Sequence, residues 1–455
     1  MDTKKLRQKI LDLAIRGKLV PQDPNDEPAS VLLERIKAEK ERLIKEGKIK
    51  RSKKTTKTSD TPHYENVPFE IPENWVWTDI ENICSKIGSG STPRGSNYSS
   101  KGIPFFRSQN IYNNGLVYED IKFISEDIHQ TMIGTEVLPN DLLLNITGGS
   151  LGRCAIVPAN FQRGNVSQHV CIMRPILIVS EYFHAFVLSS SFSKSIKITG
   201  SGREGLPKYN LERIFFPLPP LTEQYRIVSE IEHWFALINQ IEQDKLDLQE
   251  AIKQAKNKIL NIAIHGKLVP QEPSDEPASE LLKRINPKAE ITCDNAHYTQ
   301  LPKGWAICRL EQITDYEQPT DYIVKSTDYD TSYSTPVLTA GKSFIIGYTN
   351  ETTGIYSNLP CIIFDDFTTD SKLVDFPFKV KSSAMKILKV NQNIEIDYVA
   401  IFMSITKLIS DTHKRYWISE YSKLEIPIPP KKEQKRIVSA VHSIFVRLDM
   451  IMESL

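Results

Sequence analysis

Two long stretches of this sequence are nearly the same, and they start 249 residues apart. Residues 9–36 and residues 258–285 are identical at 21 of 28 positions. The repeats of a solenoid have periods of about 20 to 50 residues, so this spacing excludes a solenoid. We therefore expect two half-molecules in tandem, each built around the same frame.

A second, shorter repeat marks the end of each half. Residues 219–229 (PPLTEQYRIVS) correspond to residues 429–439 (PPKKEQKRIVS). Each Pro-Pro pair ends a stretch with β character, because proline removes a backbone hydrogen-bond donor. A helix should begin directly after each pair, and in the first copy Thr222 or a neighbour is expected to cap it.

The helix after the first Pro-Pro pair carries a heptad pattern. Its apolar residues follow 4-3 spacing over five heptads, which is typical of a coiled coil. A helix from 222 to 264 would extend about 60 Å at 1.5 Å per residue, and Gly266 and Pro270 would stop it. The predicted core positions are Ile227, Ile231, Trp234, Ile238, Ile241, Leu248, Ile252 and Ile259.

The two chain ends carry the same pattern in two pieces. The C-terminal piece has Ile437, Val441, Ile444 and Leu448, and the N-terminal piece has Leu6, Ile10 and Leu13. We expect both pieces to pack on the central helix as an antiparallel coil, with the chain ends close together. Unrelated amphipathic helices are the alternative, but they would not explain the repeated Gly-Lys-Leu-Val-Pro-Gln beside each piece.

Between the helical pieces lie segments 66–220 and 296–430, which are rich in Gly, Ser, Thr, Asn and aromatic residues. Short apolar runs between such residues predict mostly β structure with irregular loops and some helix. Apart from their ends, the two interiors do not resemble each other. The predicted fold class is α+β: two mixed, β-rich domains separated by two long antiparallel coiled-coil spacers in a circular pseudo-twofold arrangement. The helical parts would be 1–65 with a basic linker, 221–295 and 431–455.

The composition is that of a soluble globular protein of two or three domains, with 40% hydrophobic and 25% charged residues. No apolar run of 18 residues and no leader segment is visible, so a cytoplasmic protein without a membrane span is expected. The six cysteines are scattered without a C-x-x-C pair, which disfavours zinc and disulfide frameworks. A net charge of +1 neither suggests nor excludes a nucleic-acid partner.

Residues 35–57 form a basic segment, with eleven Lys and Arg against three Glu. A solvated arm and a phosphate contact are equally compatible with this segment.

No catalytic motif is complete. Gly341-Lys342-Ser343 resembles the end of a phosphate-binding loop, but Pro336 stands where that loop needs its first glycine. Asp365-Asp366 could hold a metal, yet adjacent strand residues point to opposite faces, so a hydrogen-bonding role in a loop is favoured. We expect a chain without an active site that binds no metal or cofactor.

Taken together, the two repeated motifs resemble those of the specificity subunits of type I restriction–modification systems. The resemblance rests on Gly-Lys-Leu-Val-Pro-Gln with its flanks and on Pro-Pro-x-x-Glu-Gln-x-Arg-Ile-Val, each present twice, and it extends over essentially the whole chain. It implies two target-recognition domains, each of which reads one half of a bipartite, asymmetric sequence in double-stranded DNA that is methylated at an adenine in each half. It also implies two methyltransferase subunits docked on the helices, and restriction–translocase subunits joined to that core. S-adenosylmethionine, ATP and Mg would be bound by those partners.

Base reading favours Arg, Lys, Asn, Gln, Ser and Thr on loops that reach the major groove. The candidates in the first domain are Ser91, Thr92, Arg94, Arg107, Gln109, Asn110, Arg153, Arg203 and Lys208. Those in the second are Thr339, Lys342, Thr368, Thr369, Lys414, Arg415 and Tyr416. A turn or surface role is the alternative for each. Trp75, Trp77 and Trp305 lie in apolar opening segments and are expected in the core.

Two other functions remain open from the residues alone. One is a coiled-coil adaptor that joins two protein-binding domains without touching DNA, and the other is a nuclease with an unrecognised site near Asp365. Sequence-preferring DNA binding by the assembled complex would exclude the adaptor. Metal-dependent cleavage by the isolated chain, lost in Asp365→Ala, would identify the nuclease.

Overall fold

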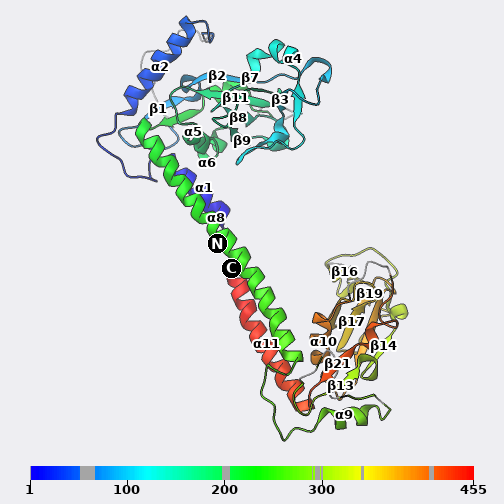
Figure 1. Cartoon of the computed structure of the whole chain (residues 1–455). Coiled ribbons are helices and arrows are strands. Elements are labelled where there is room, and N and C mark those ends of the chain that lie inside the picture. The colour runs from blue at the N-terminus through cyan, green and yellow to red at the C-terminus, as the bar shows by residue number, and fades with distance from the viewer. Residues whose placement is uncertain are drawn as a thin grey trace. The chain divides into compact units, whose positions relative to one another are not determined.

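The computed structural model describes residues 2–51, 67–196, 205–288, 290–292, 298, 301–339, 343–408 and 414–455. The chain forms two compact units, unit 1 (Met1–Gln243) and unit 2 (Asp244–Leu455). The boundary falls inside the long helix α8 (Leu221–Ile264), so each unit contains part of it (Figure 1). Each unit combines helices with small sheets, and the fold class is α+β, as predicted.

Unit 1 opens with two helices and continues with a β-rich domain. Its other helices are α1 (Thr3–Ala14), α2 (Ala29–Lys45), α3 (Ile80–Ile83), α4 (Glu126–Thr131), α5 (Ser180–Val187), α6 (Ser190–Ser195) and α7 (Lys208–Glu212). Its strands are β1 (Val76–Asp79), β2 (Cys84–Ser89), β3 (Ile103–Phe106), β4 (Ile111–Tyr112), β5 (Gly115–Leu116), β6 (Lys122–Ile124), β7 (Glu136–Val137), β8 (Leu142–Asn145), β9 (Cys154–Ile156), β10 (Gly164–Val166), β11 (Val170–Pro175) and β12 (Phe215–Leu218).

Unit 2 follows the same plan, with fewer strands among the described residues. Its helices besides α8 are α9 (Ala278–Ile285), α10 (Ile396–Ile405) and α11 (Lys431–Ser454). Its strands are β13 (Ala306–Arg309), β14 (Thr314–Glu317), β15 (Thr335–Leu338), β16 (Ile345–Thr349), β17 (Cys361–Asp365), β18 (Ser371–Val374), β19 (Lys379–Val380), β20 (Met385–Val390) and β21 (Glu425–Ile428).

The two units share a strand order that their sequences do not reveal. The main sheet runs β2-β11-β8-β9 in unit 1 and β14-β20-β17-β18 in unit 2, with antiparallel neighbours. A second sheet contains one parallel pair, β3 with β10 and β15 with β19. A two-stranded sheet joins the first strand of each domain to its last, β1 to β12 and β13 to β21. The two β domains are therefore built alike.

A central strand buried on both faces anchors each domain. In β8, Leu142 and Leu144 pack into the core that α1, α5 and α8 also line, whereas Leu143 belongs to a separate core on the other face. In β17, Phe364 and Ile363 divide between two cores in the same way. Successive side chains of a strand point to opposite faces, so a short continuous apolar run fills two cores at once.

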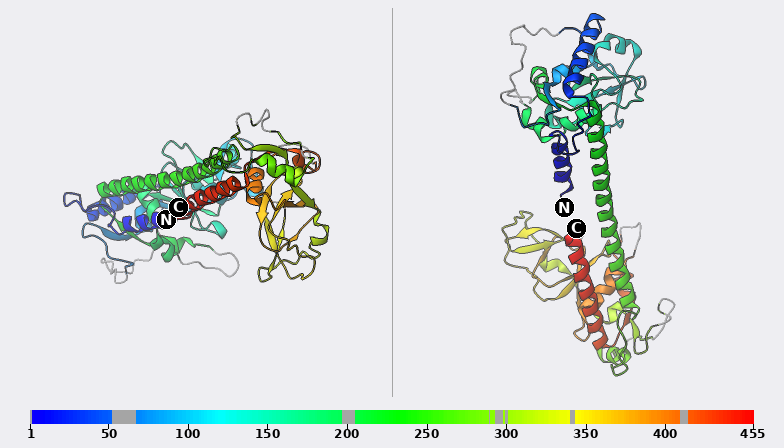
Figure 2. Two further views of the ribbon diagram at one scale, coloured as in Figure 1. Left: turned by 90° about the horizontal axis from the view of Figure 1, so that it is seen from below. Right: turned by 90° about the vertical axis from the view of Figure 1, so that its left-hand side faces the viewer.

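One helix lies beside α8 within each unit, α1 in unit 1 and α11 in unit 2 (Figures 1 and 2). In unit 1, Arg7 of α1 donates to Asn239 Oδ1 at 2.7 Å, and its guanidinium lies 5.1 Å from the centre of the Phe235 ring. In unit 2, Lys256 of α8 bonds to Asp449 of α11 at 2.5 Å. Each helix is thus paired with the part of α8 that belongs to its own unit.

The heptad prediction holds only in part. Ile227, Ile231, Ile238, Ile252, Ile10, Ile437 and Val441 are buried, and Ile259, Leu6, Leu13, Ile444 and Leu448 are half-buried. Trp234, Ile241 and Leu248 are 40%, 44% and 41% exposed, so their assignment to the core is wrong. The three exposed residues lie seven apart in one row of the heptad pattern, whereas Ile231, Ile238 and Ile252 of the other row are buried, so only one row faces the core there.

Two further findings concern the helices. Thr222 does not cap α8 but lies inside it, and its hydroxyl donates to Asp26 Oδ1 at 2.5 Å. In the described part of the chain, every helix is too short or too polar to cross a membrane.

Candidate nucleic-acid interface

Buried hydrogen bonds hold the start of α8 to the β domain of unit 1. Trp75 Nε1 donates to Glu223 Oε2 at 2.9 Å, and Gln22 Nε2 donates to the other carboxylate oxygen at 2.6 Å. The guanidinium of Arg226 pairs with Asp26 at 2.5 Å. Burial raises the pKa of Glu223, whereas the hydrogen bond from Arg226 lowers the pKa of Asp26. Residues 22 and 26 belong to the first long repeat, so this repeat lies against the start of α8. We call residues 17–26, and their counterparts 266–275 in the second repeat, the strap of each unit.

The same network recurs at the start of α11 in unit 2. Trp305 Nε1 and Gln271 Nε2 both donate to Glu433 Oε1 at 3.1 Å. Arg436 pairs with Asp275 at 2.8 Å, and burial raises the pKa of Glu433. Trp75, Trp77 and Trp305 are 3%, 8% and 3% exposed, which confirms them as core residues.

A glycine in each strap has a steric reason. Gly17 and Gly266 both have φ of +65°, and a Cβ there would lie 2.3 Å from Pro72 Cγ or 2.4 Å from Pro302 Cγ. Only glycine combines this backbone conformation with so close an approach. The network thus accounts for the Gly, Gln and Asp positions that the two repeats share.

The predicted contact loops of unit 1 meet at one edge of its main sheet. Both β2 and β8 are antiparallel to β11, so they end where β11 begins, with Ser89 opposite Cys171 and Asn145 opposite Val170. Loops 90–94, 146–153 and 167–169 leave from this edge. We call it the loop edge of unit 1. In unit 2, the corresponding loop edge is where β14 and β17 end and β20 begins.

Side chains connect the three loops of the loop edge in unit 1. The Thr92 hydroxyl donates to Gln168 Oε1, Gln168 Nε2 lies 3.2 Å from His169 Nε2, and His169 Nδ1 lies 2.8 Å from Thr147 Oγ1. Gln168 and His169 were not among the predicted contacts. A short polar turn between two buried apolar strands was the signal that could have found them.

Most predicted contacts of unit 1 are accessible. Ser91, Thr92, Arg94, Gln109 and Lys208 are exposed, and Arg107 and Arg153 are half-buried. The Arg153 guanidinium lies 4.8 Å from the centre of the Tyr112 ring, and Arg107 Nη2 donates to Asp120 O at 2.8 Å. Arg203 lies outside the described residues.

Asn110 is the exception in unit 1. Its side chain is fully buried and donates to Val117 O at 3.0 Å and Glu119 O at 3.2 Å. Its polar groups are used inside the loop, so the structure argues against a direct base contact by Asn110.

The loop edge of unit 2 repeats the backbone contacts of unit 1. Lys381 N donates to Leu338 O at 2.9 Å, as Ser167 N does to Phe106 O at 2.9 Å. Tyr416 N donates to Asp366 O at 2.9 Å, which matches the bond from Leu206 N to Ile146 O at 2.8 Å. These bonds define equivalent positions in two domains whose sequences do not align.

The predicted contacts of unit 2 divide into two groups. Thr368, Lys414 and Arg415 are exposed, and Thr339 is half-buried. Thr369 and Tyr416 are 0% and 1% exposed, and Thr369 Oγ1 accepts a hydrogen bond from Leu408 N, so the structure argues against both as contacts. Lys342 lies outside the described residues. Phe367 and Ile418, missed in the sequence, are 42% and 60% exposed beside the loop edge.

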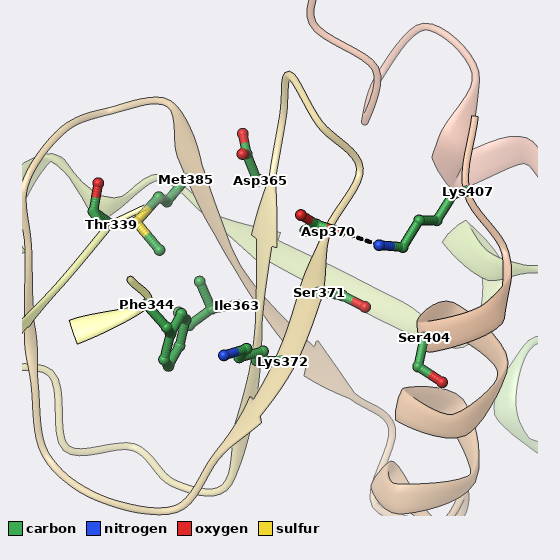
Figure 3. A pocket seen from close by; sticks show the side chains of 10 residues that line it. All are labelled: Thr339, Phe344, Ile363, Asp365, Asp370, Ser371, Lys372, Met385, Ser404 and Lys407. Carbon is green, nitrogen blue, oxygen red and sulfur yellow. Dashed lines mark hydrogen bonds and ion pairs between the residues drawn. The ribbon is translucent and has the colours of Figure 1, made fainter. Parts of the chain in front are cut away.

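A cavity of about 250 Å³ opens at the loop edge of unit 2 (Figure 3). Thr339, Asp365 and Met385 lie on its wall, and the ion pair of Asp370 and Lys407 lies at one side. Asp365 accepts hydrogen bonds from Phe367 N at 2.9 Å and from Thr368 Oγ1 at 2.6 Å. The carboxylate therefore shapes the loop, in agreement with the role favoured from the sequence. No cluster of three potential metal ligands occurs among the described residues.

Some cations of the basic segment 35–57 form exposed ion pairs with nearby glutamates. The ion pairs are Arg35–Glu27, Lys37–Glu34, Arg42–Glu39 and Arg51–Glu41. A solvated arm and a phosphate contact both stay predictions for this segment, and residues 52–57 lie outside the described residues.

Comparison with known proteins identifies the family. The family model of the type I restriction modification DNA specificity domain matches residues 72–250 and 302–452, and the chain belongs to this family. It is similar to the EcoAI specificity subunit of Escherichia coli, at 28% identity over 541 residues, covering 97% of this chain and 88% of the relative. It is also similar to the EcoEI specificity subunit of Escherichia coli, at 32% identity over 383 residues, covering 68% and 61%.

Solved structures share the fold. A chain from a study of complex assembly and conformational transition of the type I R-M system superposes with a TM-score of 0.57 at 16% identity, covering 85% of this chain and 94% of that chain. The HsdS subunit of Thermoanaerobacter tengcongensis gives a TM-score of 0.51 at 15% identity, covering 85% and 93%.

The molecule is therefore a specificity subunit of a type I restriction–modification system. Its task is to read a DNA target, and catalysis is not its role. Neither the adaptor nor the nuclease is favoured by any of these findings.

Proposed function

We propose that each unit reads one half of a bipartite, asymmetric target in double-stranded DNA. The observation that carries this proposal is that two domains with one strand order present different side chains at equivalent loop edges. Both β domains would present their loops from the same backbone arrangement. The side chains on those loops differ, and they would determine which bases each domain recognises.

In unit 1 we assign the contact surface to the linked loops. Thr92, Arg94 and Gln168 are exposed there, and His169 and Arg153 lie half-buried beside them. Amide and guanidinium groups recognise purine edges in the major groove. Because the net charge is only +1, phosphate contacts must come from local cations such as Arg94.

In unit 2 we assign the contact surface to Phe367, Thr368, Lys414, Arg415 and Ile418. This set mixes cations with two exposed apolar side chains. Apolar groups can contact the methyl group of thymine, which polar loops alone do not recognise. The two units therefore differ in chemistry at their loop edges, as an asymmetric target requires.

We further propose that two methyltransferase subunits dock on the helices and that restriction–translocase subunits join that core. S-adenosylmethionine, ATP and Mg would be bound by those partners. Exposed Trp234, Ile241 and Leu248 support docking, because residues seven apart lie on one helix face. The circular pseudo-twofold arrangement, the proximity of the chain ends and the role of the helices as a spacer stay predictions.

A binding experiment tests the proposal. The subunit is assembled with its methyltransferase, and gel shifts are measured with a duplex that carries the motif found by mapping methylated adenines in the host. We expect binding about 10³-fold or more tighter than to a scrambled duplex, and intermediate binding when one half is scrambled. Equal binding to all three duplexes would contradict the proposal.

A further inference from the structure

A buried ion pair lies directly beneath the contact surface of unit 2. Lys386 Nζ of β20 is 3.5 Å from Asp366 Oδ2, and both residues are 1% exposed. The same carboxylate accepts a hydrogen bond from Trp417 N at 2.7 Å through Oδ1. The backbone oxygen of Asp366 accepts from Tyr416 N at 2.9 Å. Asp366 thus accepts hydrogen bonds from the N–H groups of two consecutive residues, and its carboxylate forms an ion pair with Lys386.

Aromatic contacts of Trp417 also fix this segment. The Trp417 ring lies 5.1 Å from Phe364 and 6.1 Å from Tyr421, measured between ring centres. Immediately before Tyr416 are the exposed Lys414 and Arg415, and immediately after Trp417 is the exposed Ile418. The backbone that carries these three side chains is therefore anchored by one carboxylate and one aromatic cluster.

The fold itself does not need this ion pair. At the equivalent positions, unit 1 has Ile146 in place of Asp366 and Cys171 in place of Lys386, as the strand register and the Leu206–Ile146 bond define. Trp417 corresponds to Pro207, which has no N–H to donate. The carboxylate, its cation and the donor are all present in unit 2, and all three are absent from unit 1.

Burying two charges is unfavourable, and the Coulomb attraction offsets the lost hydration only while both partners are present. Apolar residues at these positions complete the same sheet in unit 1, so packing does not explain the charges. What the charges add in unit 2 is a fixed direction for the peptide groups of Tyr416 and Trp417.

We propose that Lys386 and Asp366 are positioning residues for DNA recognition by unit 2: they fix the Lys414–Ile418 segment so that Arg415 and its neighbours meet the bases in one geometry. The proposal rests on the proposed function, because it takes this segment as a DNA contact. It assigns to the pair specificity for one half of the target, and no contact with DNA.

The test compares variants in the complete methyltransferase complex. Lys386→Met leaves Asp366 buried without its cation, so the segment loses its anchor. Discrimination against single-base mismatches, measured as methylation rates on duplexes, should fall roughly 5-fold to 100-fold in the half read by unit 2. The half read by unit 1 serves as the internal reference and should be unchanged. Exchange of residues 296–430 identifies which half is which.

Two control variants separate positioning from stability. Lys379→Met removes an equally buried lysine of the same unit, which is 1% exposed and lies 3.0 Å from Glu351, and it should leave the motif unchanged. The double variant Lys386→Met/Asp366→Asn keeps an oxygen acceptor for Trp417 N without a buried charge, and it should restore discrimination. If Lys386→Met does not fold, Lys386→Gln replaces it in the same comparison.

The outcomes are distinct. Equal losses in Lys386→Met and Lys379→Met at all sites, with the motif unchanged, would overturn the positioning role. A wild-type complex that methylates without a bipartite motif would instead contradict the proposed function itself.

Discussion

At the residue scale, the repeated sequence is explained by a repeated set of buried polar contacts. Glu223 and Glu433 each accept hydrogen bonds from a tryptophan and from a strap glutamine. A buried carboxylate needs such partners, because an unsatisfied one costs about 1–3 kcal/mol or more. The donor and the acceptor are therefore retained together in both copies.

These carboxyl groups predict a pH dependence of stability. Burial raises the pKa of Glu223 and Glu433 above the ordinary value of 4.5. The folded chain binds their protons more tightly than the unfolded chain, so their contribution to folding becomes less favourable as the pH rises through this range. In the double variant Glu223→Gln/Glu433→Gln, the melting temperature relative to wild type should rise between pH 4.5 and about pH 7.

A variant with the opposite sign is the control. The pKa of Asp26 is lowered by its hydrogen bond from Arg226, so its contribution is present above the ordinary value of 3.8 and is lost as the pH falls. Asp26→Asn should therefore be most destabilising at neutral pH and less so in acid. A pH-independent difference between wild type and the double Glu variant would contradict this account.

The sequence predicted some single residues and could not predict others. Trp75 and Trp305 were placed correctly in the core because their apolar neighbours identify them. Asn110, Thr369 and Tyr416 looked like surface contacts, but the folded chain buries them, Asn110 inside its own loop and Thr369 beside Leu408. Composition shows that a loop is polar, and only the folded loop shows which polar group already has a partner.

At the element scale, α8 has two kinds of apolar residue. One kind packs within its unit, as Ile227 and Ile238 do, and the other is exposed, as Trp234, Ile241 and Leu248 are. The heptad pattern marked both, because periodicity shows that residues share a face and does not show what covers it. We attribute the exposed face to a partner subunit.

This assignment predicts the effect of a charge on that face. Ile241→Glu should weaken assembly with the methyltransferase roughly tenfold or more, because a carboxylate would enter an apolar contact. Ala236→Glu adds the same charge at an exposed position on roughly the opposite side of the helix, and it should assemble normally. Sedimentation of purified subunit mixtures measures both. Equal weakening by the two variants, or none by either, would refute docking at this face.

The presence of strands was predicted from the sequence, whereas their order in the sheets was not. Short apolar runs predicted β structure in segments 66–220 and 296–430, and strands such as β8 and β17 are present there. The strand order common to both units was not predictable, because pairings such as β3 with β10 join residues about 60 apart whose side chains differ between the units. Equivalent loops could be recognised only through their backbone hydrogen bonds.

At the scale of the whole molecule, the chain consists of two copies of one frame with different readers in each. The straps, the buried carboxylates, the helix starts and the backbone of the loop edges recur, and the side chains at the loop edges do not. A recognition protein gains from this arrangement, because a reader can change without altering the contacts that hold it to its helix.

If each unit alone determines one half of the target, exchanging one domain should change one half only. The experiment exchanges residues 66–220 for the corresponding domain of another family member and maps methylated adenines in cells that carry the complete system. We predict a bipartite motif in which one half changes and the other half keeps the wild-type sequence. A motif that is unchanged, or that changes in both halves, would contradict the claim.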